Sequence, residues 1–570
     1  MKTNLKQLKE IVFEAVNKAG FNVNPDDVRI EKAKTLEHGH FATNVALLIA
    51  GKFGRRPYDV AELLATELRK NDFFTKIDIA GPGFVNMWIE QKFYSAILEQ
   101  ILSDFDDYLK EEIDVKKGKK MVIEYSSPNI AKPLGAHHLL STIIGDSLSR
   151  ICRKYGYEVI SENYPGDIGT QFGKLIYAID TWGDEKEIEK NPIDELLKLY
   201  VRFHDEAEKD PGLEQFGRDE YKKFEDGDKK VHKMWKKIVD WSFKEIQPLY
   251  DRLNVKYDAV HGESFFEERM KDILKKGRES GIFVDGENGA WVAMSEDPND
   301  PPALVKKSDG TTLYLTRDLA QIDFFEEEYH PDVMVWVVDV AQSLHFKQRF
   351  QVAKKMNLTS SELRHVEFGR MLGMSTRKGN VVKLKEVLDE SEERCLQLID
   401  EKGAELSAKE RKELSVIMGV GAVKYNILHQ NRISNITFNW DQMLSLEGNS
   451  APYLMYTVAR AKSILRKAGL KQSGAKEFTL ELSDNAETRV VLDILAYPEA
   501  LEKAAMEFKP NHIANFLYQL AQDFNTFYNA LPVIQAEKRL MQSRLLITGA
   551  VITAMEDAFK LLGLEVPEKM

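Results

Sequence analysis

The stretch YSSPNIAKPLGAHHLLSTIIGDSL, residues 125–148, decides the fold that we expect for this chain. It continues the apolar run MVIEY (121–125), passes through a turn and ends in the pattern of an amphipathic helix. Two further apolar runs, YEVISENY (157–164) and DVMVWVVDV (332–340), are also followed by turns and helical patterns. Strands that are apolar on both faces and alternate with helices are typical of a covered parallel sheet. The sequence therefore predicts an α/β domain with a doubly wound, Rossmann-like parallel sheet.

Two adjacent histidines lie at the start of the helix that follows this turn. Ligands of doubly wound sheets bind at the carboxyl ends of the strands, where the positive end of the next helix also points. The helix is expected to begin near Ala136, so His137 and His138 fall in its first turn, and Lys132 precedes them. An imidazole there can donate a hydrogen bond to a phosphate oxygen. The alternative is that the two histidines only cap and pack the helix.

The texture of the sequence divides the chain into three domains. Residues 1–112 combine helical periodicity with two alternating strands around a Gly-Pro-Gly turn, which predicts an N-terminal α+β domain. Residues 118–400 contain the predicted sheet, interrupted by an insertion of charged helices at about 185–260. From residue 407 to residue 570 nearly every segment has helical periodicity, which predicts a C-terminal all-α helix bundle.

The composition excludes several classes of protein. The 570 residues carry a formal net charge of −12, so the chain is not expected to coat nucleic acid non-specifically. Its two cysteines, Cys152 and Cys395, have no metal-binding spacing, and we expect no metal site in the protein. No apolar run approaches the roughly 20 residues that cross a bilayer, and the N-terminus lacks the pattern of a signal peptide. We therefore expect a cytoplasmic protein with no membrane partner.

A second candidate for phosphate chemistry is the loop RMLGMSTRKGNVV, residues 370–382. Small and hydroxylated residues surround two cations, Arg377 and Lys378. Mobile cations suit a pyrophosphate leaving group, whose charge grows during the reaction. The alternative is an ordinary exposed basic turn.

Both stretches resemble the nucleotide-binding motifs of class I aminoacyl-tRNA synthetases, in the form found in arginyl-tRNA synthetases. That family usually has His-x-Gly-His where this chain has Gly135-Ala136-His137-His138, so only the second histidine is retained in place. In the loop, Met374-Ser375 and Lys378-Gly379 match the second motif, while Gly373 occupies the usual first lysine position. The resemblance implies catalytic roles for His137, His138, Arg377 and Lys378. It also implies ATP-binding roles for Lys132, Pro133, Gly135, Ala136, His345, Met374 and Ser375.

A planar, cationic substrate side chain requires fixed carboxylates with bidentate geometry. Glu124 ends an apolar strand, and Tyr314 and Asp318 are four residues apart, so they share a face if their segment is helical. Each also has an ordinary explanation, as a structural ion pair, a helix cap or a solvated loop residue. The resemblance implies that arginine is contacted by Glu124, Asn129, Tyr314, Asp318 and Gln342.

Candidate RNA contacts lie in both terminal domains. Tyr453, Tyr456 and Arg460 fall on one face of a predicted helix, where they can stack on unpaired bases or simply pack the core. This helix resembles part of the anticodon-binding domain of arginyl-tRNA synthetases, and the resemblance places the terminal residue Met570 near the anticodon. The N-terminal domain resembles the additional domain of the same family. There Phe84 and Asn86 are implied to meet the D-loop of the tRNA, unless the turn is only a packed hairpin tip.

The resemblance extends over nearly the whole chain and implies the activity of an arginine–tRNA ligase. ATP and L-arginine would form arginyl-adenylate, with Mg²⁺ on the phosphates, and the arginyl group would pass to the terminal adenosine of tRNA(Arg). We expect a monomer that needs bound tRNA to activate arginine. Two alternatives stay open: a catalytically inactive RNA-binding relative, because of the altered Gly-Ala-His-His sequence, and a synthetase for another amino acid such as lysine.

Overall fold

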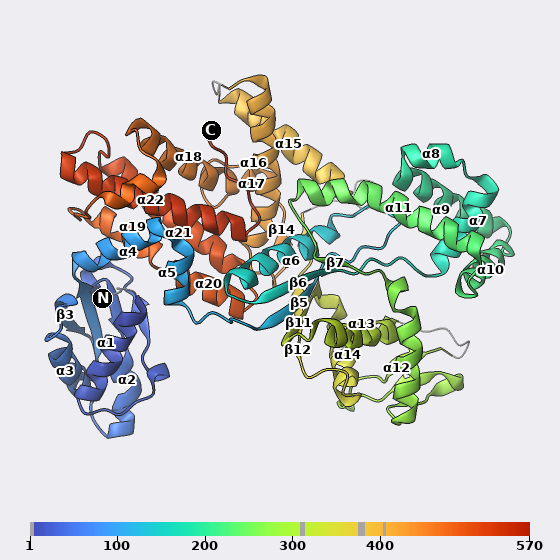
Figure 1. Ribbon diagram of the computed structural model, residues 1–570, viewed down its shortest axis with the longest axis horizontal. Helices are drawn as coiled ribbons and strands as arrows, with labels where there is room; N and C mark the ends of the chain where they lie inside the picture. Colours follow the sequence, from blue (N-terminus) through green and yellow to red (C-terminus); the bar gives the residue numbers. More distant parts are fainter. Residues whose placement is uncertain (1–4, 308–313, 374–381, 403–405) are drawn as a thin grey trace. The chain divides into compact units, whose positions relative to one another are not determined.

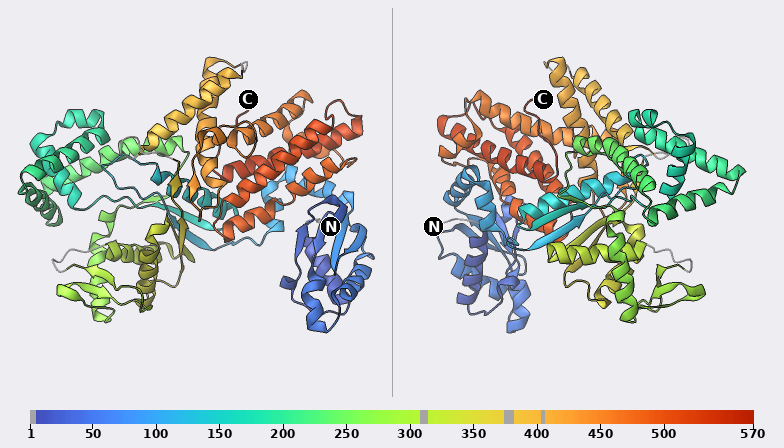
Figure 2. Two further views of the ribbon diagram at one scale, coloured as in Figure 1. Left: turned by 180° about the vertical axis from the view of Figure 1, so that it is seen from behind. Right: turned by 45° about the vertical axis from the view of Figure 1, so that its right-hand side comes forward.

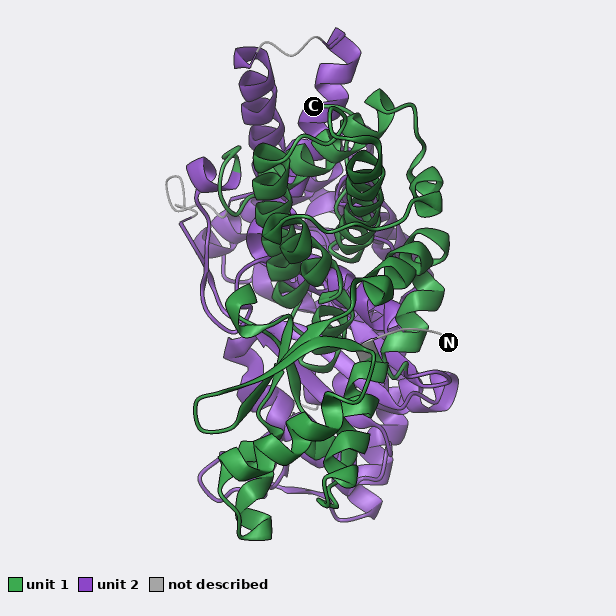
Figure 3. Cartoon of the chain, turned by 90° about the vertical axis from the view of Figure 1, so that its left-hand side faces the viewer, with its two compact units in different colours: residues 1–115, 444–570 green, residues 116–443 purple. Residues whose placement is uncertain are grey.

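The computed structural model describes residues 5–307, 314–373, 382–402 and 406–570 of the chain (Figure 1). The chain forms two compact units, shown in two colours in Figure 3. We call them the central unit, Lys116–Met443, and the terminal unit, which combines Met1–Val115 with Leu444–Met570. The terminal unit therefore joins the two ends of the sequence.

The central unit is built on a parallel sheet of five strands in the order β12-β11-β5-β6-β7. Every neighbouring pair in it is parallel. The chain enters at the middle strand, continues to β6 and β7 on one side, and later returns to β11 and β12 on the other. The five strands of this sheet are β5 Lys120–Glu124, β6 Glu158–Asn163, β7 Ala259–Val260, β11 Val333–Asp339 and β12 Glu362–Phe368. The predicted doubly wound α/β sheet is confirmed, and its strand order reverses between β5 and β11, which is where such sheets bind ligands.

The apolar sequence of the strands is explained by helices that pack against the sheet. Met121, Val122 and Ile123 of β5 are at most 1% exposed. Val122 belongs to the same core cluster as Trp336 of β11 and Phe325 of α13. The covering helices are α6 His137–Lys154, α13 Tyr314–Tyr329 and α14 Ser343–Lys355. The interior strands β5 and β11 are buried along most of their length, and Glu124 lies at the carboxyl end of β5, where the site is found.

Further elements of the central unit extend from this sheet, and Figure 2 shows the helical insertion from two more directions. The expected insertion consists of helices, which begin slightly earlier than predicted: α7 Thr170–Trp182, α8 Glu185–Lys190, α9 Pro192–Lys209, α10 Leu213–Glu225 and α11 Lys229–Arg252. Helix α12 Glu267–Glu279 and an antiparallel three-stranded sheet follow. The sequence analysis did not predict this sheet, which consists of β8 Phe283–Asp285, β9 Trp291–Ala293 and β10 Ala303–Lys306. The unit ends with β13 Met371–Leu372, α15 Leu384–Glu401, α16 Ala408–Leu428, β14 Ile436–Thr437 and α17 Trp440–Met443.

The terminal unit contains the predicted α+β part and the predicted helices. Its four-stranded antiparallel sheet has the order β1-β2-β4-β3, and β3 and β4 form the expected hairpin. The α+β part comprises α1 Leu5–Lys18, β1 Ile30–Lys32, β2 Phe41–Thr43, α2 Val45–Ile49, α3 Pro57–Leu68, β3 Phe74–Ala80, β4 Phe84–Ile89, α4 Gln91–Ser103 and α5 Phe105–Glu112. The helical part comprises α18 Ala451–Lys467, α19 Asn485–Ile494, α20 Tyr497–Met506, α21 Asn511–Ala530 and α22 Lys538–Leu561.

Short 3-10 helices complete both units: η1 Pro25–Asp27, η2 Leu36–His38, η3 Ala50–Phe53, η4 Glu263–Phe266, η5 Glu287–Gly289, η6 Val340–Gln342 and η8 Gln472–Glu477. Within the terminal unit, the two parts are joined by hydrogen bonds of Gln91. Its Nε2 donates to the backbone oxygen of Leu480 (2.5 Å), and its Oε1 accepts from the N–H of Leu482 (3.0 Å). The α+β part and the helical part therefore pack as one body.

Candidate active site

Two buried carboxylates meet at the switch point of the central sheet. Glu124 is the last residue of β5 and is 4% exposed, although it is paired in register with Trp336 of the apolar strand β11. Asp318 lies in α13 and is 8% exposed. The charge of Asp318 contributes to raising the pKa of Glu124, so the two carboxyl groups are electrostatic neighbours. The structure thus brings together the two acidic residues that the sequence analysis singled out for the substrate.

A third charged residue, Arg349 of α14, lies with these carboxylates and was missed by the sequence analysis. Its side chain is 2% exposed, and its guanidinium carbon lies 4.2 Å from the centroid of the Trp336 ring. Nη2 donates to the backbone oxygen of Asp318 (3.1 Å) and to Oε1 of Gln321 (2.6 Å), while Nη1 lies 3.9 Å from Oδ1 of Asp318. One feature of the sequence could have identified Arg349: it follows His345 by four residues, which places both side chains on the same face of one helix.

The two carboxyl groups differ in their pKa. Burial raises the pKa of Glu124 to about 7, against the charge of Arg349 and the hydrogen bond that Ser127 Oγ donates to Oε1 (2.6 Å). Burial also acts to raise the pKa of Asp318, but Arg349 and His345 outweigh it and lower that pKa below its usual value. His345 Nε2 lies 2.5 Å from Oδ2 of Asp318. Asp318 is therefore ionised at neutral pH, and Glu124 exchanges its proton close to neutral pH.

The turn after Glu124 has an unusual backbone that is held from outside. Ser126, Ser127 and Ala131 have positive φ angles of 73°, 43° and 61°. The N–H of Ser126 donates to Ser141 Oγ of α6 (2.9 Å), and the N–H of Ala131 donates to Ser242 Oγ of α11 (3.0 Å). Left-handed conformations cost free energy in residues with a side chain and persist where the surroundings fix them. The hydroxyl groups of two neighbouring helices thus fix the path of the backbone between the sheet and α6.

Three predicted arginine contacts lie at the same edge of the sheet with exposed side chains. Tyr314 is the first residue of α13 and is 66% exposed, and the Arg317 guanidinium carbon lies 6.0 Å from its ring centroid. Gln342 ends η6, directly after β11, and Asn129 lies in the turn that follows β5. All three are exposed and lie close in sequence to Asp318, His345 or Glu124, and their contact with arginine stays a prediction.

His138 is held in one tautomer by the helix start. Its Nδ1 accepts a hydrogen bond from the backbone N–H of Gly135 (3.1 Å), and its backbone oxygen accepts from Thr142 Oγ1 (2.7 Å). A backbone N–H can only donate, so Nδ1 is the acceptor and the proton of the neutral ring lies on Nε2. His138 can therefore offer an Nε2–H donor, and Gly135 supports this histidine.

The start of α6 is joined to the segment that follows the second motif. Ala136 N–H donates to the backbone oxygen of Val382 (2.9 Å), and Leu384 N–H donates to that of Leu134 (2.8 Å). Gly135 and Lys383 form an antiparallel bridge between these two bonds. Val382, the last residue of the second stretch, and the residues after it are thus adjacent to the start of α6.

The other predicted nucleotide residues have the following places. Lys132 is exposed with Nζ 5.3 Å from the ring centroid of Tyr200, Pro133 is half-buried, and His137 is the first residue of α6. The predicted residues Met374, Ser375, Arg377 and Lys378 lie outside the residues that the structure describes.

The two RNA contacts predicted in the α+β part lie on β4 and differ in exposure. Phe84, at the start of β4, is 41% exposed and available for stacking. Asn86, two residues further along the strand, is 5% exposed. The contact of either side chain with a nucleotide stays a prediction.

The predicted aromatic face of α18 is formed with the help of α21. The Arg460 guanidinium carbon lies 4.8 Å from the Tyr456 ring centroid and 4.9 Å from that of Tyr528. Asn525 Nδ2 donates to the hydroxyl of the half-buried Tyr453 (3.0 Å), and its Oδ1 accepts from Arg460. Tyr456 is 42% exposed, so it offers a stacking surface, whereas Tyr453 mainly supports it.

The end of the chain lies against the same helix. Lys462 of α18 forms an ion pair with Glu568 (2.7 Å). Met570, two residues further, is half-exposed beside it.

Comparisons with known proteins agree over the full length of the chain. Three family models match in order: the arginyl tRNA synthetase N terminal domain over residues 6–89, the class I (R) tRNA synthetase catalytic domain over 98–440 and the DALR anticodon binding domain over 454–570. The chain is 39% identical over 576 residues to the arginine–tRNA ligase of Fusobacterium nucleatum subsp. nucleatum, with 100% of both chains covered. It is 40% identical over 547 residues to that of Exiguobacterium sp., with 95% of each chain covered.

Solved structures show the same fold. The arginyl-tRNA synthetase of Plasmodium falciparum is 25% identical, with a TM-score of 0.84 over 100% of both chains. The arginyl-tRNA synthetase of Thermus thermophilus is 23% identical, with a TM-score of 0.80 over 99% of this chain and 100% of that chain, which shows the shared fold.

Proposed function

The chain belongs to the arginyl-tRNA synthetase family of class I and is an arginine–tRNA ligase, and on this premise we propose that Glu124 and Asp318 hold the guanidinium of the substrate. The observation that carries this assignment is the burial of both carboxylates at the switch point of one sheet. Arg349 neutralises one of the two negative charges. A substrate guanidinium neutralises the other, and its planar fork suits two carboxylates better than the ammonium of lysine does.

In the first step, the carboxylate of arginine attacks the α-phosphorus of ATP and pyrophosphate leaves. We assign the Nε2–H of His138 to a phosphate oxygen, because Gly135 fixes this tautomer at the N-terminus of α6. The ATP-binding assignments of Lys132, Pro133, Ala136 and His345 rest on their positions around the same helix start and the facing α14. Sequence similarity alone supports the remaining assignments. These are the catalytic roles of His137, Arg377 and Lys378 and the ATP-binding roles of Met374 and Ser375. Positioning and charge stabilisation are the main contributions of a protein to phosphoryl chemistry.

Mg²⁺ is proposed as a companion of ATP. Among the described residues, no group of three or more histidine, cysteine, aspartate or glutamate side chains could hold a metal ion. The described residues therefore form no metal cage, and the phosphate oxygens of ATP would provide the ligands of the ion. Bound in this way, Mg²⁺ would neutralise phosphate charge.

In the second step, the arginyl group passes to the terminal adenosine of tRNA(Arg). We assign the anticodon side to Tyr456 and Arg460, supported by Tyr453, with Met570 nearby, and the D-loop side to Phe84 and Asn86. The proposed domains are residues 1–112 for the tRNA elbow, 118–400 for catalysis and 407–570 for the anticodon. The protein is proposed to act as a cytoplasmic monomer, and no helix among the described residues is long and apolar enough to cross a membrane.

The substrate assignment is tested with the variants Asp318→Asn and Glu124→Gln. For each, the KM for arginine is measured in steady-state charging of tRNA. Either change should raise the KM for arginine by about 100-fold or more, because one charged bidentate contact is lost and a buried cation is left unpaired. Asp323→Asn is the matched control, because it removes a carboxylate from the same helix. The carboxylate of Asp323 pairs with Arg269 (2.7 Å) and not with Arg349. If both variants keep the KM of the control, the guanidinium is bound elsewhere.

A further inference from the structure

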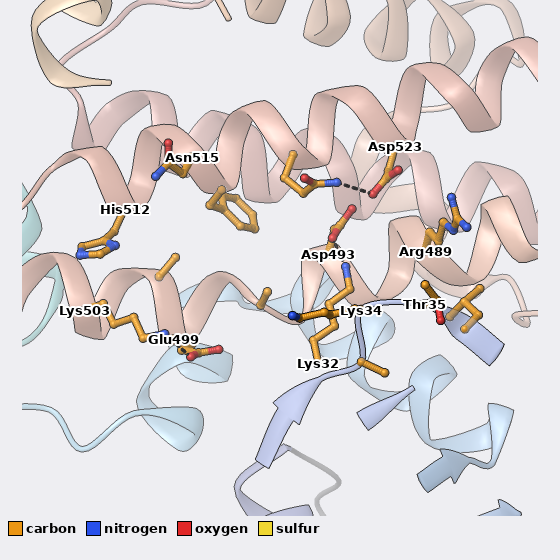
Figure 4. Close-up of a pocket in the computed structure, with 16 residues that line it drawn as sticks. Lys32, Lys34, Thr35, Arg489, Asp493, Glu499, Lys503, His512, Asn515 and Asp523 are labelled. Carbon is orange, nitrogen blue, oxygen red and sulfur yellow. Dashed lines mark hydrogen bonds and ion pairs between the residues drawn. The ribbon is translucent and has the colours of Figure 1, made fainter. Parts of the chain in front are cut away.

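A hollow of about 640 Å³ lies within the terminal unit, where the segment after β1 faces α19, α20 and α21 (Figure 4). Its volume falls in the range of roughly 300–1,000 Å³ that is typical of small-molecule sites. Lys34 and Thr35 line one wall, Arg489 of α19 another, and Phe516 of α21 contributes an apolar surface. An adjoining hollow of about 290 Å³ shares Arg489, so the space continues along α19.

Two cations of this hollow lack a direct ion pair among the described residues, although the charge of Arg489 acts on Asp523. Lys34 and Arg489 are exposed, and neither forms an ion pair with a described residue. The other two lining cations are paired: Lys32 contacts Asp493, and Lys503 lies 2.5 Å from Glu499. The unpaired cations lie on different elements, one on the α+β part and one on the helical part.

The acidic residues of the hollow contribute less negative charge than their number suggests. Burial, and then a hydrogen bond with Asp523, raise the pKa of Asp493 to about 7. The pKa of Asp523 is lowered: burial acts against this, but hydrogen bonds from Asp493 and from Gln519 Nε2 (2.8 Å), with the charges of Lys32 and Arg489, outweigh it. The two acids therefore share a proton near neutral pH. The hollow is lined by four lysine and arginine side chains against three acidic side chains, so its cations outnumber its acids.

We propose that this hollow binds a small phosphate-bearing ligand of mononucleotide size, with Lys34 and Arg489 on the phosphate and Phe516 beside its apolar part. Arg489 can contact phosphate oxygens in a bidentate manner, and the exposed ammonium of Lys34 adds a point charge. This site is additional to the nucleotide site of the central unit.

The concave shape favours a free ligand over the backbone of an RNA. A phosphodiester chain lies along open basic surfaces, whereas this hollow is closed at the back by Asp493 and Phe516, which are 3% and 7% exposed. A ligand that bridges Lys34 and Arg489 would also tie the α+β part to the helical part. Binding should therefore stabilise the terminal unit by mass action.

The experiment is the titration of the full-length protein with AMP, followed by calorimetry, for the wild type, Lys34→Ala, Arg489→Ala and the double variant. AMP can also occupy the active site, so the informative quantity is the difference between proteins. The wild type should bind one more AMP than the double variant, and each single variant should weaken this extra event by about 10-fold or more. Lys476→Ala in η8 and Arg539→Ala in α22 are the matched controls, because each removes an exposed cation of the same unit.

A second arm measures the affinity for tRNA(Arg) as a function of salt in the same proteins. If AMP binding is equal in all of them but the salt dependence falls by about one phosphate contact per lost cation, the phosphate comes from RNA. A retained extra AMP site in the double variant, with unchanged tRNA binding, would overturn the proposal. Circular dichroism of each variant confirms that these surface changes leave the fold intact.

Discussion

At the scale of single residues, the substrate site is governed by the burial of charge. A buried carboxylate keeps its charge only if a cation or strong hydrogen bonds lie nearby. Arg349 supplies such a cation permanently, since Trp336 stacks on its guanidinium and Gln321 accepts from it. The protein therefore contains one guanidinium of its own and leaves one negative charge for the guanidinium of arginine. This arrangement makes Arg349 a positioning residue for Asp318.

Arg349→Met should raise the KM for arginine by about 10–100-fold, with a smaller change in kcat. The charge of Arg349 lowers the pKa of both Glu124 and Asp318, so without it both carboxyl groups hold their protons to higher pH. The curve of KM against pH should accordingly shift to higher pH. Loss of one partner of a buried ion pair costs about 3–5 kcal/mol of stability. Arg349→Lys is therefore tested in parallel, because it keeps the positive charge and should restore part of the affinity for arginine. A pH profile that stays in place in both folded variants would assign Arg349 a purely structural role.

Glu124 should make arginine binding release a proton. Its pKa of about 7 means that a large fraction of the unliganded enzyme carries the proton at pH 6.5, and a bound guanidinium favours the charged form. The affinity for arginine should rise from about pH 5 to about pH 7 and then level off. Calorimetry in two buffers of different ionisation enthalpy measures the proton directly. Glu124→Gln should abolish the release, and a release that persists in this variant would point to another group.

At the scale of elements, the contact between β5 and α6 positions both halves of the site. Gly145 of α6 faces the ring of Tyr125, and a Cβ built there would lie 2.2 Å from Tyr125 Cγ. The helix can therefore approach the carboxyl end of β5 only because this residue has no side chain. The same approach brings the start of α6, with His138, to the turn that follows Glu124.

Gly145→Ala should destabilise the protein although alanine favours helices. The gain in helix propensity is about 1 kcal/mol, whereas the overlap with Tyr125 forces a shift that typically costs about 1–3 kcal/mol in a packed core. The net effect, followed by urea denaturation, should be a loss of stability together with a higher KM for ATP. Gly474→Ala in η8 is a control, since a Cβ there meets its nearest neighbour only at 3.7 Å. Equal or greater stability of Gly145→Ala would contradict the packing argument.

The sequence was informative where one local pattern determines an element. The apolar runs predicted three of the five parallel strands, β5, β6 and β11, and the Gly-Pro-Gly turn predicted the β3–β4 hairpin. Glu124 lies at the end of a strand, as the rule that parallel strands end at one edge led us to expect, whereas Asp318 lies within helix α13, four residues after Tyr314. These signals are short in range and depend on few neighbours.

Features set by tertiary packing could not be predicted in this way. Arg349 reads as a surface cation of an amphipathic helix, and only the meeting of α13, α14 and β11 buries it. Asn86 follows Phe84 by two residues on the same face of β4, yet neighbouring side chains bury it while Phe84 stays exposed. Residues 408–428 have the same helical periodicity as the C-terminal part of the sequence. They form α16, which packs with α15 in the central unit.

At the scale of the whole molecule, the two ends of the sequence form one compact unit. The contact of Lys32 with Asp493 joins β1 to α19 inside that unit. Burial first, and the hydrogen bond with Asp523 next, raise the pKa of Asp493 to about 7. The folded chain thus holds a proton that the unfolded chain releases above about pH 4.

This proton should make the terminal unit less stable as the pH rises from about 4 to about 7. In that window the folded state binds more protons than the unfolded state, so deprotonation favours unfolding. Asp493→Asn should flatten the dependence of the urea midpoint on pH in this range, as measured by the fluorescence of the unfolding transition. Asp484→Asn, at the N-cap of α19, is a control that leaves the pair with Asp523 intact. An equally steep dependence in Asp493→Asn would assign the proton to another group.

The measurement that tests the central claim most directly compares arginine with citrulline, its neutral isostere, as substrates for the charging of tRNA(Arg). If Glu124 and Asp318 recognise a guanidinium by charge, kcat/KM for citrulline should be lower by about 1,000-fold or more, because the substrate would leave a buried carboxylate unpaired. Comparable kcat/KM values for the two amino acids would show that shape alone selects the substrate and would contradict the account.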